Sequence, residues 1–133
     1  MTVAVDTNIL VRLVARDHEA QFRVAQKLLE TEHVFIAESV LLETEWVLRA
    51  IYKLPSPEIR RTIRNILGLK NVTLADPDKI ARILDWHEAG MDFADAFHLA
   101  NSLHLKDFKT FDRDFVKRSK KLSSALPCKV SPI

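Results

Sequence analysis

Four acidic residues that are far apart in the chain stand where a carboxylate could meet a metal ion: Asp6, Glu43, Asp95 and Asp112. Each lies at the end of an expected strand or on a helix face that we expect to be turned inward. Clustered carboxylates repel and raise one another's pKa, so a fold that gathers them normally needs a divalent cation. Oxygen ligands alone suit Mg²⁺ or Mn²⁺, whereas zinc would recruit Cys or His. The set therefore predicts a magnesium or manganese site.

Glu43 also has a purely structural interpretation. Winding its helix at about 3.6 residues per turn places Glu45, Arg49 and Lys53 on one solvated stripe. The same winding places Glu43 away from that stripe, among side chains that should face the core. An unpaired carboxylate there is costly unless a cation or hydrogen bonds receive it. If the helix is rotated slightly, Glu43 simply sits at a wet boundary.

The two later aspartates have structural alternatives as well. Asp92 and Asp95 share one face of an expected helix, at spacing i and i+3. Asp92 is the better helix cap, because Gly90 should end the preceding helix, and this leaves Asp95 without a structural role. Asp112 follows an expected strand and could simply cap the next helix, with Asp114 interacting with the helix dipole.

The elements that must position these residues alternate between strand and helix, which indicates an α/β domain with a mainly parallel sheet. The expected strands cover residues 2–6, 33–37, 71–75, 106–111 and 128–130. The expected helices cover residues 7–15, 17–32, 39–53, 56–69, 76–90, 91–105 and 112–121. The expected helix caps include Thr7 or Asn8, Asp17 and Ser39. In parallel sheets ligands collect at the carboxyl ends of strands, where Asp6 and Asp112 lie.

Length and composition fit one domain over residues 1–133 with a single core. The net charge of +2 says little, so a nucleic-acid function must be argued from where the charges lie. One cysteine cannot form an internal disulfide, and we expect a soluble, cytoplasmic protein without a membrane span. Two glycines are too few for a phosphate-binding loop, and no G-x-S-x-G motif is present.

Four segments resemble, in order, the signature segments of PIN domains, and specifically of the VapC-type toxin ribonucleases of toxin–antitoxin pairs. They span most of the chain and read VDTNILVRL, LLETEWVLR, DFADAFHLA and KTFDRDF. The resemblance implies a PIN-like three-layer α/β/α domain with a mainly parallel central sheet. It also implies an endoribonuclease that uses Mg²⁺ or Mn²⁺ to hydrolyse RNA phosphodiester bonds.

By position, the acidic metal-binding and catalytic set of that family falls on Asp6, Glu43, Asp95 and Asp112, with Asp92 and Asp114 as accessories. The motifs leave open whether Asp92 or Asp95 is the direct ligand. Polar positions that help to orient carboxylates or water fall on Thr7, Asn8 and Thr110.

The resemblance further implies a homodimer and a VapB-like antitoxin whose C-terminal segment covers the groove near the acidic site. An RNA substrate that approaches an acidic pocket needs a basic surround. Candidates for phosphate contacts are Arg12, Arg16, Arg60, Arg61, Arg64, Arg113 and the run KRSKK, which includes Lys117 and Arg118. For any single one of these residues, an ordinary solvated charge is the better interpretation. Trp46 and Tyr52 are expected in the core or against a partner.

Two other functions stay open. A magnesium-dependent phosphatase or phospho-acceptor α/β domain also places an aspartate after its first strand, although haloacid-dehalogenase phosphatases have D-x-D where this chain has Asn8 in the last position. A non-catalytic PIN fold could bind only RNA or protein. The intact acidic set argues against this second alternative, since a pure binding module has no reason to keep mutually repelling carboxylates.

Overall fold

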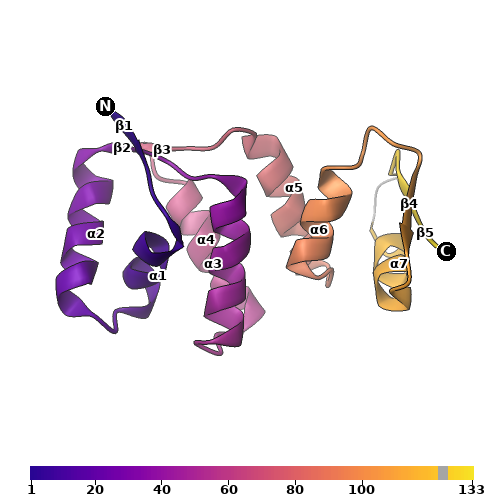
Figure 1. Ribbon diagram of the computed structural model, residues 1–133, viewed down its shortest axis with the longest axis horizontal. Helices are drawn as coiled ribbons and strands as arrows, with labels where there is room; N and C mark the ends of the chain where they lie inside the picture. Colours follow the sequence, from indigo (N-terminus) through magenta and orange to yellow (C-terminus); the bar gives the residue numbers. More distant parts are fainter. Residues whose placement is uncertain (123–125) are drawn as a thin grey trace. The chain divides into compact units, whose positions relative to one another are not determined.

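The protein has a mixed α/β fold, and every strand pair that its computed structural model describes is parallel, as predicted (Figure 1). The structure describes residues 1–122 and 126–133. The chain forms two compact units, Met1–Pro77 and Asp78–Ile133. None of the described helices is long and apolar enough to cross a membrane.

The first unit contains a three-stranded sheet in the order β1-β2-β3. Val3 of β1 pairs with Val34 of β2, and Phe35 of β2 pairs with Thr73 of β3. Its strands are β1 (Thr2–Ala4), β2 (His33–Phe35) and β3 (Val72–Thr73). Its helices are α1 (Thr7–Ala15), α2 (Glu19–Thr31), α3 (Glu38–Ala50) and α4 (Ser56–Leu67). The strand–helix alternation predicted for this part of the chain is confirmed.

Helical apolar spacing buries one face of each helix in the first unit, which fixes the rotation of α1 and α3. The buried side chains include Leu10 of α1, Ala25 of α2, Leu41 and Leu48 of α3, and Ile59 of α4. Both α2 and α3 contact α1. Two neighbouring helices therefore hold α1 in place.

The N-caps of α2 and α3 differ from the prediction. The N-cap of α2 is His18 and not Asp17, and the ring nitrogen Nδ1 of His18 accepts a hydrogen bond from the Gln21 amide at 3.1 Å. Asp17 is instead engaged in an ion pair with α1. The N-cap of α3 is Ala37, which has no side-chain hydrogen bond, and Ser39 lies inside the first turn.

The second unit contains α5 (Pro77–Glu88), whose first residue belongs to the first unit, α6 (Phe93–Ala100), α7 (Arg113–Lys120) and the paired strands β4 (Asp107–Thr110) and β5 (Lys129–Pro132). Gly90 ends the α5 segment with φ 108°, a value that favours glycine. The predicted continuation of α6 to residue 105 is wrong. Asn101 ends the helix, because its side-chain amide donates to the Phe97 carbonyl at 3.0 Å.

Candidate functional site

The predicted acidic residues are distributed over both units. Asp6 and Glu43 belong to the first, and Asp92, Asp95, Asp112 and Asp114 belong to the second. Each group has its own internal geometry, which is set by the ends of α1, α6 and α7 and by one face of α3.

In the first unit, Asp6 follows β1 and is itself the N-cap of α1, so the prediction that Thr7 or Asn8 caps this helix is wrong. Its Oδ1 accepts a hydrogen bond from the Ile9 amide at 3.3 Å. The second oxygen, Oδ2, is not used by the helix end, and the residue is exposed. The cap thus orients a carboxylate that still has an oxygen available for a ligand.

Glu43 lies on an exposed face of α3, and the predicted rotation of this helix is wrong. Glu43 accepts a hydrogen bond from the hydroxyl of Thr7, which is buried. Glu45 is the buried glutamate, with 2% of its surface exposed, and Arg49 donates to its Oε2 from Nε at 2.8 Å. Lys53 never joins the predicted stripe, because α3 ends at Ala50.

In the second unit, two aspartates cap helices. Asp92 accepts from the Asp95 amide through Oδ2 at 3.2 Å and is the N-cap of α6, as predicted. Asp112 is the N-cap of α7, and its Oδ1 accepts from the amides of Asp114 and Phe115 at 2.9 and 3.2 Å. The Asp112 amide in turn donates to the Thr110 hydroxyl at 3.0 Å. Oδ2 of Asp112 is left for another ligand.

Asp95 differs from these capping residues, because its carboxylate makes no hydrogen bond to another described residue. Burial raises its pKa, and the negative charges of Asp92 and Asp112 raise it further. Coulombic interactions with His98 and then with Arg118 on α7 lower the same pKa and offset a smaller part of this effect. A carboxylate that is repelled by two others favours a bound cation.

All of these donors are carboxylate oxygens, which is the ligand type that suits Mg²⁺ or Mn²⁺. Within either unit, no three Asp, Glu, His or Cys side chains of the described residues lie close enough together to hold a metal ion. The chemistry of the donors therefore fits the predicted metal, although neither group is a complete set of ligands by itself.

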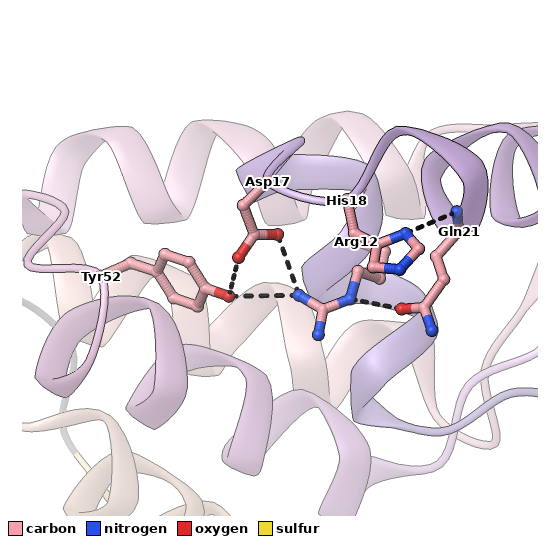
Figure 2. Close-up of polar contacts among 5 residues, drawn as sticks. All are labelled: Arg12, Asp17, His18, Gln21 and Tyr52. Atoms are coloured by element: carbon pink, nitrogen blue, oxygen red, sulfur yellow. Dashed lines mark hydrogen bonds and ion pairs between the residues drawn. The ribbon is translucent and has the colours of Figure 1, made fainter.

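Arg12 on α1 is held by three side chains, as Figure 2 shows. Its Nε donates to Gln21 Oε1 at 2.6 Å, and its Nη1 donates to Asp17 Oδ1 at 2.9 Å and to the Tyr52 hydroxyl oxygen at 3.2 Å. The Tyr52 hydroxyl donates to Asp17 Oδ2 at 2.8 Å. The hydrogen bond with Tyr52 is the main cause that raises the pKa of Arg12 and lowers that of Asp17. Arg12 is thus a paired cation.

The other predicted phosphate contacts have varied surroundings. The Arg16 guanidinium lies 4.2 Å from the centre of the Phe22 ring. Arg113, Lys117 and Arg118 are exposed on α7, the helix that Asp112 caps. The remaining basic candidates lie on α4 and at the C-terminal end of α7 and its cap: Arg60, Arg61, Arg64, Lys120 and Lys121.

The two aromatic residues expected in the core or against a partner are more accessible than a core position allows. Trp46 is 51% exposed. Tyr52 is half-buried and belongs to the hydrogen-bonded group around Arg12. Trp46 therefore does not lie in the core, and its contact with a partner stays a prediction.

A pocket of about 460 Å³ between α1 and α2 was not predicted from the sequence. We call it the α1–α2 pocket, and its main lining residues are Asp6, Asn8, Ile9, Arg12, Gln21 and Val24. The polar and apolar residues that line it alternate as they do on any helix surface. The sequence alone therefore does not distinguish this pocket from ordinary surface.

Comparison with known families bears on the alternatives. A family model described as the PIN domain matches residues 3–121. The chain belongs to the PIN-domain family. The match extends over both units and contains all four motif segments. PIN domains are generally nucleases that depend on divalent metals, so the family favours a nuclease over a phosphatase or phospho-acceptor domain. No curated protein matched the chain in a sequence search.

Proposed function

We propose that this PIN domain is an endoribonuclease dependent on Mg²⁺ or Mn²⁺, and that it acts as the toxin of a VapBC-type toxin–antitoxin pair. The observation that carries this proposal is the family match over residues 3–121. It is supported by the resemblance of the four motif segments, which places the acidic set of the family on Asp or Glu at each of its four positions. A fold kept only for binding has no need of that set.

The proposed ligands are Asp6, Glu43, Asp95 and Asp112. The helix amides that bind one oxygen of Asp6 and of Asp112 fix the direction of the other. The Thr7 hydroxyl holds one oxygen of Glu43 in the same way. We propose accessory roles for Asp92 and Asp114, and a role for Thr110 in orienting Asp112.

The chemistry that a divalent cation supplies in such sites is to polarise a non-bridging phosphate oxygen, lower the pKa of a water molecule and stabilise the leaving oxygen. The protein's share is to hold the carboxylates in fixed directions and to orient the attacking water with one of them. Asp95 suits a position beside the cation, because its neighbours already disfavour an uncompensated negative charge there.

The toxin role adds partners to this activity. We propose a homodimer in the cytoplasm and a VapB-like antitoxin whose C-terminal segment covers the groove near the acidic residues. The basic residues of α7, Arg113, Lys117 and Arg118, are proposed to contact RNA phosphates, because they are exposed on the helix that Asp112 caps.

Cleavage of total cellular RNA tests the nuclease. We expect cleavage in Mg²⁺ or Mn²⁺, loss of cleavage in EDTA, and loss in Asp112→Asn, which keeps an N-cap because Asn caps helices as well as Asp. Asp78→Asn, an exposed position in the first turn of α5, is the matched control and should cut normally. Cleavage that survives in EDTA or in Asp112→Asn would contradict the proposal.

Expression in cells tests the toxin role separately. We expect growth arrest when the active protein is produced alone, and relief when the adjacent small reading frame is expressed with it. Asp112→Asn should be harmless at the same level of soluble protein. Normal growth with verified active wild-type protein would leave a nuclease that is not a toxin.

A further inference from the structure

The α1–α2 pocket begins at a proposed metal ligand and extends along two helices. Asp6 precedes α1, and Arg12 lies six residues further, which is about 9 Å of helix rise. The side chains of Ile9 and Val24 supply apolar surface, and 67% of Val24 is exposed. The volume of about 460 Å³ falls within the range of roughly 300–1,000 Å³ that small-molecule sites occupy.

Two amino groups of this pocket have no hydrogen-bond partner among the described residues. They are Nη2 of Arg12 and Nε2 of Gln21, and Figure 2 shows both on the same side of the bond that joins the two residues. Arginine has only donors, so the Gln21 oxygen must face Arg12 and its amino group must face away. The 2.6 Å bond thus fixes the orientation of both donor groups.

These donors carry little net charge as a group. Asp17 lies 2.9 Å from Arg12 Nη1 and balances its charge, and Asp6 adds a negative charge to the pocket lining. A phosphate would be repelled by both carboxylates while it approached the guanidinium. The site is better suited to an uncharged group that presents adjacent hydrogen-bond acceptors and a flat apolar face.

We propose, resting on the ribonuclease function above, that the α1–α2 pocket binds one unpaired guanine base of the RNA beside the phosphodiester bond that is cut. Guanine presents two acceptors, O6 and N7, side by side on one edge, whereas adenine presents an acceptor and a donor. Arg12 and Gln21 donate to these acceptors, and Ile9 and Val24 contact the ring. Proteins commonly read RNA sequence through unstacked bases of this kind.

Gln21→Glu is the sharpest test, because it replaces the amino group by an acceptor and keeps the size of the side chain. Gln26→Glu is the matched control: it adds the same charge at an exposed position of α2 outside the pocket lining. The substrate is a short single-stranded RNA library with randomised sequence. The readouts are the base frequencies around the cut sites and the salt dependence of the cleavage rate.

Wild type and Gln26→Glu should prefer guanine at one position near the cut by about ten-fold or more, which is what a good bidentate base contact provides. Gln21→Glu should lose that preference and keep the salt dependence of Gln26→Glu. An unchanged preference in Gln21→Glu, or a wild type without one, would overturn the proposal. A uniform loss over all sequences with a weaker salt dependence would assign a phosphate contact instead.

Binding separates this proposal from the nuclease itself. The same RNA library is bound to Asp112→Asn, which should not cut, and to the double variant Asp112→Asn, Gln21→Glu. The RNA that each protein retains is then sequenced. Guanine enrichment that depends on Gln21, in a wild type that cuts no RNA, would support the pocket and contradict the nuclease. Cleavage by the wild type without any base preference would support the nuclease and contradict the guanine pocket.

Discussion

Two glutamates of α3, only two residues apart, have opposite surroundings. Glu45 is buried and accepts a hydrogen bond from Arg49, which is itself exposed. Glu43 is exposed, and its partner is the neutral hydroxyl of Thr7, the residue next to Asp6. A carboxylate paired with a guanidinium is already compensated. One that is held by a hydroxyl keeps a negative charge that a cation can use.

Two aspartates of the second unit differ in the same way. Asp107 accepts from the Ser131 hydroxyl at 2.6 Å and lies 3.2 Å from the Lys109 ammonium, and these contacts lower its pKa. Asp95 has a raised pKa because of burial and two neighbouring carboxylates. The direction of the shift thus separates a carboxylate whose charged form its neighbours stabilise from one whose charged form they disfavour.

The comparison on α3 predicts the largest difference in activity. Glu43→Gln should reduce RNA cleavage by on the order of 100-fold or more, because it removes a proposed metal ligand. Glu45→Gln should leave cleavage by the folded protein within a few-fold. Initial rates on one RNA in Mn²⁺ measure both. Equal losses in the two variants would mean that the contrast between the two glutamates has no functional meaning.

Removing the hydroxyl that holds Glu43 should have an intermediate effect. Thr7→Val keeps the shape of the side chain, and we expect a roughly ten-fold loss of cleavage, which is typical of a residue that orients a metal ligand. Thr44→Val is the matched control on α3, since the Thr44 hydroxyl only donates to the Val40 carbonyl at 2.7 Å. Raising the Mn²⁺ concentration should partly rescue Thr7→Val. Without such rescue, the Thr7 hydroxyl does not act through the metal.

Stability should show the opposite order on α3. Glu45→Gln removes the charge that compensates Arg49, and we expect a loss of about 1–2 kcal/mol in the free energy of unfolding, moderated because Arg49 can reach water. Glu43→Gln should change the free energy by less than about 0.5 kcal/mol, as for other exposed positions. Urea unfolding in EDTA gives both values. A Glu43→Gln variant that is the less stable of the two would reverse the interpretation of α3.

The smallest expected effect is on pH dependence without metal. The raised pKa of Asp95 means that the folded state binds its proton more tightly than the unfolded state does. The contribution of this proton to the free energy of unfolding is therefore present at low pH. It is lost as the pH rises from the ordinary carboxyl pKa through the raised one. Thermal melts of wild type and Asp95→Asn in EDTA at several pH values measure this contribution. The melting temperature of Asp95→Asn should fall less than that of the wild type over this pH range. Parallel pH profiles would show that Asp95 is not strained.

Local sequence signals predicted much of the fold. The bounds of α1 were predicted as residues 7–15 and are Thr7–Ala15, because a polar start and a helical apolar period lie within the segment itself. Asp92 was recognised as a cap for the same reason. The cap of α2 was missed, because Asp17 is drawn away by Tyr52, which is 35 residues distant in sequence.

The site was predicted less completely than the fold. The positions of the acidic residues came from the motifs, whereas the burial of Glu45 and the exposure of Glu43 depend on how α3 packs against α1 and α4. Of the predicted stripe, Glu45 and Arg49 do form an ion pair, but Glu45 is buried and Lys53 lies beyond the end of α3. The pairing of Arg12 and the α1–α2 pocket depend on contacts between helices, which no periodicity within one helix can reveal.

Titration of Mn²⁺ into the metal-free protein tests the central claim most directly, with calorimetry or the Mn²⁺ electron paramagnetic resonance signal as the readout. Wild type should bind Mn²⁺, and Asp6→Asn and Asp112→Asn should each lose most of that binding while they stay folded, because Asn preserves the helix cap in both. Asp78→Asn should bind like the wild type. If the wild type binds no Mn²⁺, or if both cap variants bind it as tightly as the wild type, Asp6 and Asp112 are structural caps and not metal ligands.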